Sequence, residues 1–327
     1  MDMKVNSVAV LRGGPSAEYD ISLLTGSGVL SALNDLGIRT KDIVISRSGQ
    51  WLVNGFQKKP EDALHDIDVV FLALHGAYGE DGTVQRLLDR LAVPYTGSGP
   101  YASAIAMNKE LTKSYLKDSG IKTAQHKRVI REKVTDPMQT ALDISEVFGP
   151  RYVVKPTSGG SSIGTMLVQN PHELGAAIKK LLTEHDDLLV EEYIYGKEAT
   201  VGILENFREQ ELYHLPVIEI IPPEEAGFFA AGVKYTGATT EICPGRFCKA
   251  EKEEMAKAAQ TIHKTLGLRH YSRSDFIVAT DGIYFLEVNT LPGLTSESLL
   301  PKSITAVGGD YKGLIEHLLT QASGDLV

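Results

Sequence analysis

One hairpin-like segment carries a pattern of oxygen ligands. Asp275 stands in one β-like run, and Glu287 and Asn289 stand two positions apart in the next. Residues two apart in a strand point to the same side, so Glu287 and Asn289 should share a face. A turn at Asp281-Gly282 would bring Asp275 across from them. Two carboxylates and an amide on one face predict a Mg²⁺ site, with a solvated polar strand face as the alternative.

A second feature is a lysine that ends a β-like run and precedes a loop of small residues. The segment reads Lys155-Pro-Thr-Ser-Gly-Gly-Ser-Ser-Ile-Gly164. Glycine lets backbone N–H groups approach an anion and serine hydroxyls add donors, so such loops bind phosphate. It is not a Walker A motif, because the Gly-Lys-Ser/Thr ending is missing. We interpret the segment as a phosphate-binding loop, with a flexible hairpin as the alternative.

The same loop also matches G-x-S-x-G, the nucleophile motif of serine hydrolases, at Gly160–Gly164. That motif needs a strand before it and a helix after it. Here a short apolar run, 165–168, is stopped by Asn170-Pro171, which predicts the second strand of a hairpin. His263 could serve as the base by chain order, but its predicted helix favours a hydrogen-bonded surface histidine. The hydrolase hypothesis is therefore disfavoured.

Acidic residues at two further positions could recognise a ligand. Glu191 and Glu192 end a β-like run before a glycine, where they could hydrogen-bond a purine edge and a ribose hydroxyl. Glu18 stands at the start of a predicted helix, where it could bind an ammonium group. Taken alone, the first pair would more often be solvent-facing strand residues, and helix capping or the helix dipole would explain Glu18. The residue pattern alone leaves both questions open.

Two further features suit a reaction that develops negative charge. Arg273 lies two residues before Asp275 on the same strand face, and its planar guanidinium suits a carboxylate or a forming oxyanion. A polar, glycine-bearing stretch begins at Lys234-Tyr235, and loops of this kind commonly act as lids. An ordinary surface loop is the alternative for that stretch.

Composition limits the class of protein. The chain has 327 residues and a formal net charge of -9, which argues against nucleic acid as a partner. It has no apolar stretch of the length that crosses a membrane. Its two cysteines, Cys243 and Cys248, lack metal spacing and favour free thiols in a reducing compartment. We expect a cytoplasmic protein with no membrane partner.

The order of predicted elements indicates an α/β protein of three domains. Strands at 7–11, 42–46 and 69–74 alternate with helices, which predicts a parallel sheet with ligands beyond the carboxyl ends of its strands. A small β-rich central domain and a third domain with antiparallel strands follow. A strand at 188–194 is expected to begin that third domain. The expected boundaries are 1–97, 98–190 and 191–327.

Taken together, these segments resemble the D-alanine–D-alanine ligases of the ATP-grasp superfamily. The resemblance covers nearly the whole chain in order. Its motifs include Gly13-Gly14-Pro-Ser-Ala-Glu18, Ala73-Leu74-His75-Gly76, Asn108-Lys109, Val154-Lys155-Pro156, Gly160-Ser161-Ser162-Ile-Gly164, Lys234-Tyr235, Glu287-Val-Asn289-Thr-Leu-Pro-Gly293 and Thr295-Ser-Glu-Ser298-Leu299. It implies a three-domain ATP-grasp fold with an N-terminal Rossmann-like parallel-sheet domain, and ATP held between the central and C-terminal domains.

The resemblance also implies roles at the nucleotide. Phosphate contacts are implied for Lys109, Lys155, Ser161, Ser162 and Lys234. The residues implied to hold the adenosine are Glu191, Glu192, Ile194 and Glu198. The implied ligands of Mg²⁺, usually two ions, are Asp275, Glu287 and Asn289. Mn²⁺ is implied as a substitute ion and K⁺ as an activator.

Other roles are implied at the amino-acid substrates. Glu18 would bind the ammonium of the first D-alanine with His75 nearby, and Ser161 and Tyr235 would link to Glu18 when the lid closes. The oxyanion of the tetrahedral intermediate would be stabilised by Arg273 and the Gly293 backbone. The carboxylate of the second substrate would be held by Ser298 and Leu299.

The implied reaction joins two D-alanines for peptidoglycan precursor synthesis. The first carboxylate attacks the γ-phosphate of ATP to give an acylphosphate, and the second amine then displaces phosphate. The alternative is a related ligase whose second substrate is D-lactate, D-serine or another amino acid. The Lys234-Tyr235 pair favours an amine, since depsipeptide-forming relatives commonly alter it. A nucleotide-binding module without catalysis is a further alternative, and a homodimer is expected.

Overall fold

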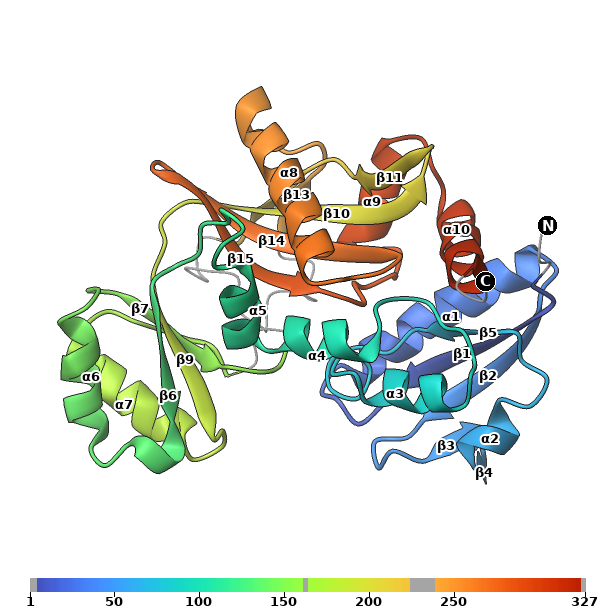
Figure 1. Cartoon of the computed structure of the whole chain (residues 1–327), viewed down its shortest axis with the longest axis horizontal. Coiled ribbons are helices and arrows are strands. Elements are labelled where there is room, and N and C mark those ends of the chain that lie inside the picture. The colour runs from blue at the N-terminus through green and yellow to red at the C-terminus, as the bar shows by residue number, and fades with distance from the viewer. Residues whose placement is uncertain (1–4, 161–163, 224–238, 325–327) are drawn as a thin grey trace.

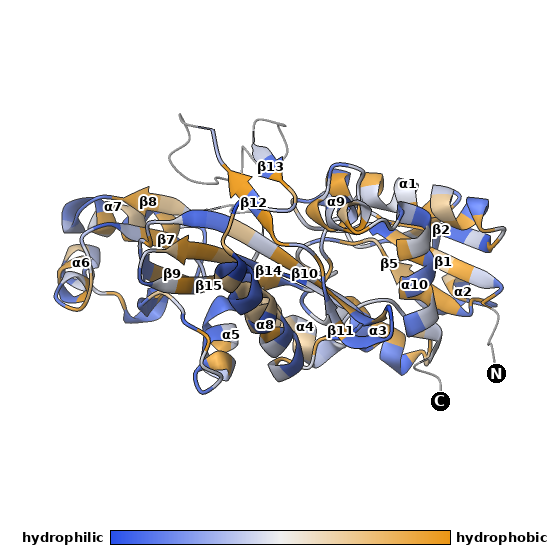
Figure 2. Ribbon diagram, turned by 90° about the horizontal axis from the view of Figure 1, so that it is seen from above, coloured by the Kyte–Doolittle hydropathy of each residue, from blue (hydrophilic) through white to orange (hydrophobic). Residues whose placement is uncertain are grey.

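The computed structural model describes residues 5–160, 164–223 and 239–324. Within these ranges the strands form three β-sheets, each covered by helices (Figure 1). The sheets follow one another along the chain, and each has its own apolar interior. Figure 2 shows apolar residues along the strands, whereas the helices carry both apolar and polar residues. The predicted α/β class is confirmed.

The first sheet has the strand order β4-β3-β2-β1-β5. Its strands are β1 Ser7–Gly13, β2 Arg39–Ile45, β3 Trp51–Val53, β4 Phe56–Lys58 and β5 Val69–Leu72. The predicted parallel arrangement is confirmed for β1, which is parallel to both β2 and β5. The antiparallel hairpin β3–β4 was not predicted, although Asn54-Gly55 is a strong signal for a two-residue hairpin turn.

Four helices accompany the first sheet. They are α1 Tyr19–Asp35, α2 Pro60–Ala63, α3 Thr83–Arg90 and, from the other end of the chain, α10 Tyr311–Gly324. α10 packs beside α1 (Figure 1) and buries Leu314, Ile315 and Leu318 in the same core as Val8 and Val10. Helix α10, near the C-terminus, therefore completes the N-terminal core.

The second sheet has the order β6-β9-β7-β8. Its strands are β6 His126–Ile130, β7 Tyr152–Pro156, β8 Met166–Val168 and β9 Asp187–Glu192. Nearby helical segments are α4 Pro100–Met107, α5 Lys109–Leu116, the 3-10 turn Arg131–Lys133, α6 Pro137–Ser145 and α7 Pro171–Leu181. The expectation that strand 188–194 begins the third domain was wrong, because β9 pairs with β6 and β7.

The third sheet is antiparallel, as predicted, with the order β13-β12-β10-β14-β15 and β11 paired to β10. Its strands are β10 Lys197–Phe207, β11 Gln210–His214, β12 Ile218–Ile221, β13 Thr240–Ile242, β14 Tyr271–Ala279 and β15 Gly282–Asn289. Its helices are α8 Lys249–Thr265, which packs on the sheet, and α9 Leu299–Ala306.

The hairpin β14–β15 carries the predicted oxygen ligands. Ala279 pairs with Gly282, so the two-residue turn is Thr280-Asp281, one position before the predicted turn. Gly282 has a φ of +139°, which an L side chain rarely adopts.

None of the helices described is long and apolar enough to cross a membrane.

Candidate active site

A cavity of about 1940 Å³ is bordered by segments that belong to all three sheets or follow them. Every predicted site residue that the structure describes lines it: Glu18, His75, Lys109, Lys155, Glu191, Glu192, Ile194, Glu198, Arg273, Asp275, Glu287, Asn289, Gly293, Ser298 and Leu299. The predicted residues Ser161, Ser162, Lys234 and Tyr235 lie outside the described residues. The structure thus brings the described set together, while the role of each residue stays a prediction.

The hairpin β14–β15 places its polar residues by strand register. Asp275 lies directly opposite Glu287, and Arg273 lies opposite Asn289. The guanidinium of Arg273 donates two hydrogen bonds of 3.0 Å to the two carboxylate oxygens of Asp275. Thr200 on β10 donates a bond of 2.6 Å to the same carboxylate. These contacts fix the orientation of Arg273 at the cavity wall, as a planar fork on a carboxylate should.

Helix α5 carries a lysine to this hairpin. Asn108 caps the helix by accepting a hydrogen bond of 3.0 Å from the Leu111 backbone, which fixes the position of its first residue, Lys109. The Lys109 ammonium donates to the Gly159 carbonyl at 2.7 Å and lies 3.3 Å from Glu287 Oε2. Lys109 therefore connects the predicted phosphate-binding loop to the predicted metal ligands.

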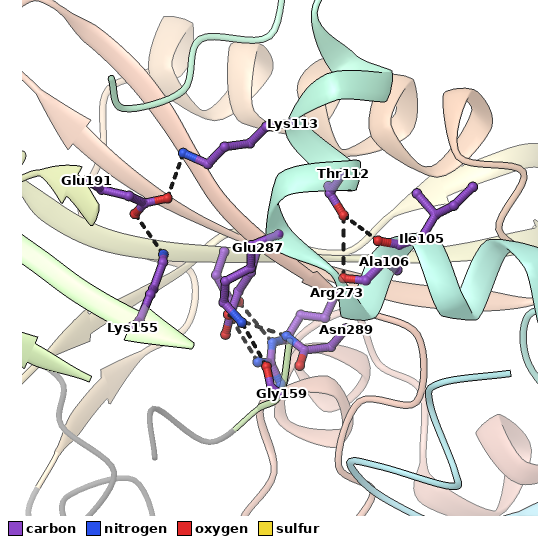
Figure 3. Close-up of polar contacts among 12 residues, drawn as sticks. Ile105, Ala106, Thr112, Lys113, Lys155, Gly159, Glu191, Arg273, Glu287 and Asn289 are labelled. Atoms are coloured by element: carbon purple, nitrogen blue, oxygen red, sulfur yellow. Dashed lines mark hydrogen bonds and ion pairs between the residues drawn. The ribbon is translucent and has the colours of Figure 1, made fainter. Parts of the chain in front are cut away.

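Glu191 is buried between two lysines. Its Oε1 lies 2.7 Å from Lys113 Nζ, and its Oε2 lies 2.7 Å from Lys155 Nζ (Figure 3). Burial alone would raise the pKa of this carboxyl, but Lys155 and Lys113 together lower it to about 2. Sequence reasoning missed Lys113, although it follows Lys109 by four residues and so shares its helix face. We call Lys109, Lys113, Lys155 and Glu191 the lysine side.

Glu80 is a second residue to which sequence reasoning assigned no role. Its carboxylate accepts a hydrogen bond of 2.9 Å from the Gly76 backbone and one of 3.2 Å from the Leu291 backbone. It thereby ties the loop after β5 to the segment after β15. Burial, together with the nearby charge of Glu18, raises the pKa of Glu80 to about 7. We call Glu18, Glu80, Asp275 and Glu287 the acidic side.

His75 makes a parallel connection between the same two segments. Its Nδ1 lies 3.0 Å from the Leu291 carbonyl, and its Nε2 lies 2.9 Å from the Thr25 hydroxyl. A carbonyl can only accept, so Nδ1 carries the proton of the neutral ring. Burial is the main cause that lowers the pKa of His75. Both nitrogens are occupied within the protein, so a direct role toward substrate would require one of these bonds to break.

The segment that follows β15 ends at helix α9. Ser298 precedes α9, and its hydroxyl accepts a bond of 3.0 Å from the Thr295 backbone. A Cβ at Gly293 would lie only 2.7 Å from that hydroxyl, so this close approach requires glycine.

At the other wall, Glu192 accepts a bond of 2.8 Å from the Gln125 backbone. Hence part of the acid set predicted around adenosine also holds loops in place.

The structure contradicts the serine-hydrolase alternative. β7 and β8 pair as an antiparallel hairpin around the G-x-S-x-G loop, and strand β8, not a helix, follows Gly164. The expectation of a surface histidine at position 263 was wrong, since His263 is only 1% exposed. Its ring nitrogens lie 2.8 Å from the Ser272 hydroxyl and 3.3 Å from Glu205 Oε1, so its polar groups are satisfied inside the protein.

Comparison with known proteins gives a consistent result. The family model for the C-terminus of D-Ala–D-Ala ligases matches residues 115–320, and the model for their N-terminus matches residues 54–98. The D-alanine–D-alanine ligase of Geobacter sulfurreducens is 39% identical over 325 residues, which cover 98% of this chain and 95% of that protein. The chain belongs to the D-alanine–D-alanine ligase family. It is therefore an enzyme of the ligase class.

Solved structures of similar ligases share the fold of this family member. D-alanyl-alanine synthetase A from Vibrio cholerae has a TM-score of 0.88 at 25% identity, covering 98% of this chain and 99% of that one. The VanG D-Ala:D-Ser ligase from Enterococcus faecalis has a TM-score of 0.83 at 28% identity, covering 98% of this chain and 100% of that one. The ligase described here has the ATP-grasp fold, as predicted.

Members of this ligase family use ATP and typically a divalent metal ion. The donor set on β14–β15 fits a hard cation, because carboxylate and amide oxygens are its preferred ligands. Among the described residues, no three His, Cys, Asp or Glu side chains gather as a metal cluster. The hairpin oxygens that could hold such an ion belong to the carboxylates of Asp275 and Glu287 and the amide of Asn289.

Proposed function

We propose that this enzyme joins two D-alanines to D-alanyl-D-alanine for peptidoglycan precursor synthesis, converting ATP to ADP and phosphate. The observation that carries the proposal is the contact between the two sides of the cavity, where the Lys109 ammonium lies 3.3 Å from the Glu287 carboxylate. Cations for a triphosphate and oxygen ligands for a metal thereby meet in one place. Phosphoryl transfer depends mainly on such positioning and charge neutralisation.

In the first step, the carboxylate of one D-alanine attacks the γ-phosphate, ADP leaves, and an acylphosphate forms. Lys109 and Lys155 would bind phosphate oxygens, and Glu18 at the start of α1 would bind the substrate ammonium. Glu191, Glu192, Ile194 and Glu198 line the same cavity and would surround the adenosine. Ser161, Ser162, Lys234 and Tyr235, outside the described residues, keep their predicted roles over the phosphates and in the lid.

In the second step, the amine of the other D-alanine attacks the acyl carbon, and the tetrahedral intermediate expels phosphate. Arg273 is held in one orientation by Asp275, so its guanidinium would stabilise the oxyanion without reorganisation. The Gly293 backbone would add a donor. Ser298 and Leu299 would hold the second carboxylate at the start of α9. The closed site would exclude water, which would otherwise hydrolyse the acylphosphate.

Asp275, Glu287 and Asn289 would hold Mg²⁺, and we propose two ions, replaceable by Mn²⁺. When bound, the metal neutralises charge on the transferred phosphoryl group. The register that places Asp275 opposite Glu287 supports this assignment. K⁺ as an activator is retained as a prediction.

We also propose a cytoplasmic homodimer in which each subunit has three domains. The free thiols of Cys243 and Cys248 and the use of ATP suit a reducing compartment. One domain boundary is proposed near residue 97. The other is proposed just after β9, which ends at Glu192, because that strand belongs to the central sheet.

An acceptor panel tests the proposal. The enzyme is supplied with Mg·ATP and D-alanine, and phosphate release is measured with added D-alanine, L-alanine, D-serine or D-lactate at neutral pH. We expect D-alanine to support turnover without any other acceptor. Mass spectrometry should identify D-alanyl-D-alanine as the product. A clear preference for D-serine or D-lactate would show that this compound, and not D-alanine, is the second substrate. ADP formation that does not depend on any amino acid would reject ligation.

A further inference from the structure

Lys113 is a buried lysine that the proposed reaction does not use. Its side chain is 3% exposed, and it is absent from the described lining of the cavity. Its ammonium lies 2.7 Å from Glu191 Oε1 and donates to the Ala124 carbonyl at 3.3 Å. Lysine is almost never buried so completely without a compensating anion. Its function is therefore tied to Glu191.

The Glu191 carboxylate contacts more than one cation. Two lysines flank one carboxylate, and Figure 3 shows them on different sides of it. Lys155 lines the cavity, whereas Lys113 approaches the carboxylate from helix α5. Of the two lysines, Lys155 is the one at the cavity wall, where its ammonium can contact an anionic ligand.

This arrangement sets a condition for any contact between Lys155 and a phosphate. The Lys155 ammonium is held by Glu191 at 2.7 Å, so a phosphate must draw it away or share it. Removing the last counter-ion from a buried carboxylate is strongly unfavourable. With Lys113 in place, Glu191 keeps one cation and Lys155 can change its partner.

We propose that Lys113 is a positioning residue for nucleotide binding, because it neutralises Glu191 permanently and so allows Lys155 to bind a phosphate of ATP. The inference rests on the proposed function only in taking a nucleoside triphosphate as the ligand of Lys155. Helix α5 would then provide two lysines that act at the site. Lys109 faces the cavity, and Lys113, one turn later, supports the lysine on the neighbouring strand β7.

A double-mutant cycle on equilibrium ATP binding tests this inference. Lys113→Met removes the charge and leaves Lys155 as the only cation on Glu191. We expect Kd for Mg·ATP, measured by calorimetry without D-alanine, to rise about tenfold to hundredfold. KM for D-alanine should stay within about twofold, because its predicted contacts are on other elements. Lys117→Met removes an exposed lysine from the end of the same helix and should leave Kd unchanged.

The same substitution in a Glu191→Gln background separates positioning from general destabilisation. With no buried carboxylate to neutralise, Lys113→Met should change Kd by less than about twofold relative to Glu191→Gln alone. This comparison also serves if the single variant fails to fold. An equal loss of ATP affinity in both backgrounds, or an unchanged Kd in folded Lys113→Met, would overturn the inference. A wild type that binds ATP but does not ligate D-alanine would reject only the proposed reaction.

Discussion

Glu191 and Glu80 are two carboxylates at one cavity, and their pKa values shift in opposite directions. Glu191 belongs to the lysine side, where two ammonium groups lower its pKa to about 2. Glu80 belongs to the acidic side, where burial and Glu18 raise its pKa to about 7. The lysine side therefore carries surplus positive charge for an anion, and the acidic side carries surplus negative charge for cations. Under the proposed function, this difference would orient the triphosphate toward one side and the metal and the substrate ammonium toward the other.

Removing a carboxylate from the acidic side should have the largest effect. Glu287→Ala would remove a proposed metal ligand, so we expect kcat to fall on the order of a thousandfold, equivalent to about 4 kcal/mol. The steady-state rate of ADP formation with D-alanine measures this. Glu253→Ala, at an exposed position of α8, is the control and should retain the wild-type rate. A rate near wild type in Glu287→Ala would remove that residue from the metal site.

Arg273 contacts the acidic side through Asp275. Because its geometry is fixed, its substitution should have the next largest effect on kcat. Arg273→Lys keeps the charge but loses the planar fork on Asp275, so we expect kcat to fall about a hundredfold. Kd for ATP should change little. The matched control is Arg128→Lys, which alters a bidentate pair with Asp187 outside the described cavity lining. If Arg273→Lys weakened ATP binding and left kcat unchanged, Arg273 would belong with the nucleotide.

Lys155 offers a smaller test on the lysine side. Lys155→Met would remove a phosphate contact and leave Glu191 paired with Lys113, so the fold should persist. We expect Kd for ATP to rise about tenfold to hundredfold, the effect of one hydrogen bond to a charged group. Calorimetry measures this, with exposed Lys127→Met on β6 as the control. Unchanged ATP affinity would show that the positive surplus at this wall does not bind the triphosphate.

The pH dependence of stability should distinguish the two carboxylates directly. The pKa of Glu191 falls from 4.5 to about 2, so its contribution is present above pH 4.5 and is lost as the pH falls toward 2. The pKa of Glu80 rises from 4.5 to about 7, so the folded state binds the extra proton and loses stability as the pH rises through that range.

Urea unfolding at a series of pH values measures both slopes. Relative to wild type, Glu191→Gln should remove the loss of unfolding free energy below pH 4.5. Glu80→Gln should remove the decrease in unfolding free energy between pH 4.5 and 7. If both variants shifted the profile in the same direction, the opposite charge character of the two sides would be contradicted.

Local sequence patterns predicted part of the geometry of the site. Alternation in the strands predicted that Asp275, Glu287 and Asn289 would share a face, and the hairpin register bears this out. Two wrong expectations, strand 188–194 and the surface histidine at 263, have a common cause. Strand pairing and burial depend on contacts between distant segments, such as β9 with β6, and no local pattern encodes them.

The same cause explains the residues that were missed. Lys113 lies in a polar helix, and Glu80 lies in a polar loop, so each has the local appearance of a solvated residue. Only the fold shows that Lys113 meets Glu191 and that Glu80 meets the Leu291 backbone. Resemblance to a ligase family supplied the predicted substrate residues, whereas the supporting residues required the three-dimensional structure.

The acylphosphate is the central element of the proposed reaction, and oxygen-18 transfer tests it most directly. D-alanine labelled with oxygen-18 in its carboxylate is incubated with the enzyme and Mg·ATP, and the released phosphate is analysed by mass spectrometry. If the carboxylate attacks the γ-phosphate, each phosphate released should carry a single labelled oxygen. Unlabelled phosphate formed together with D-alanyl-D-alanine would contradict the account.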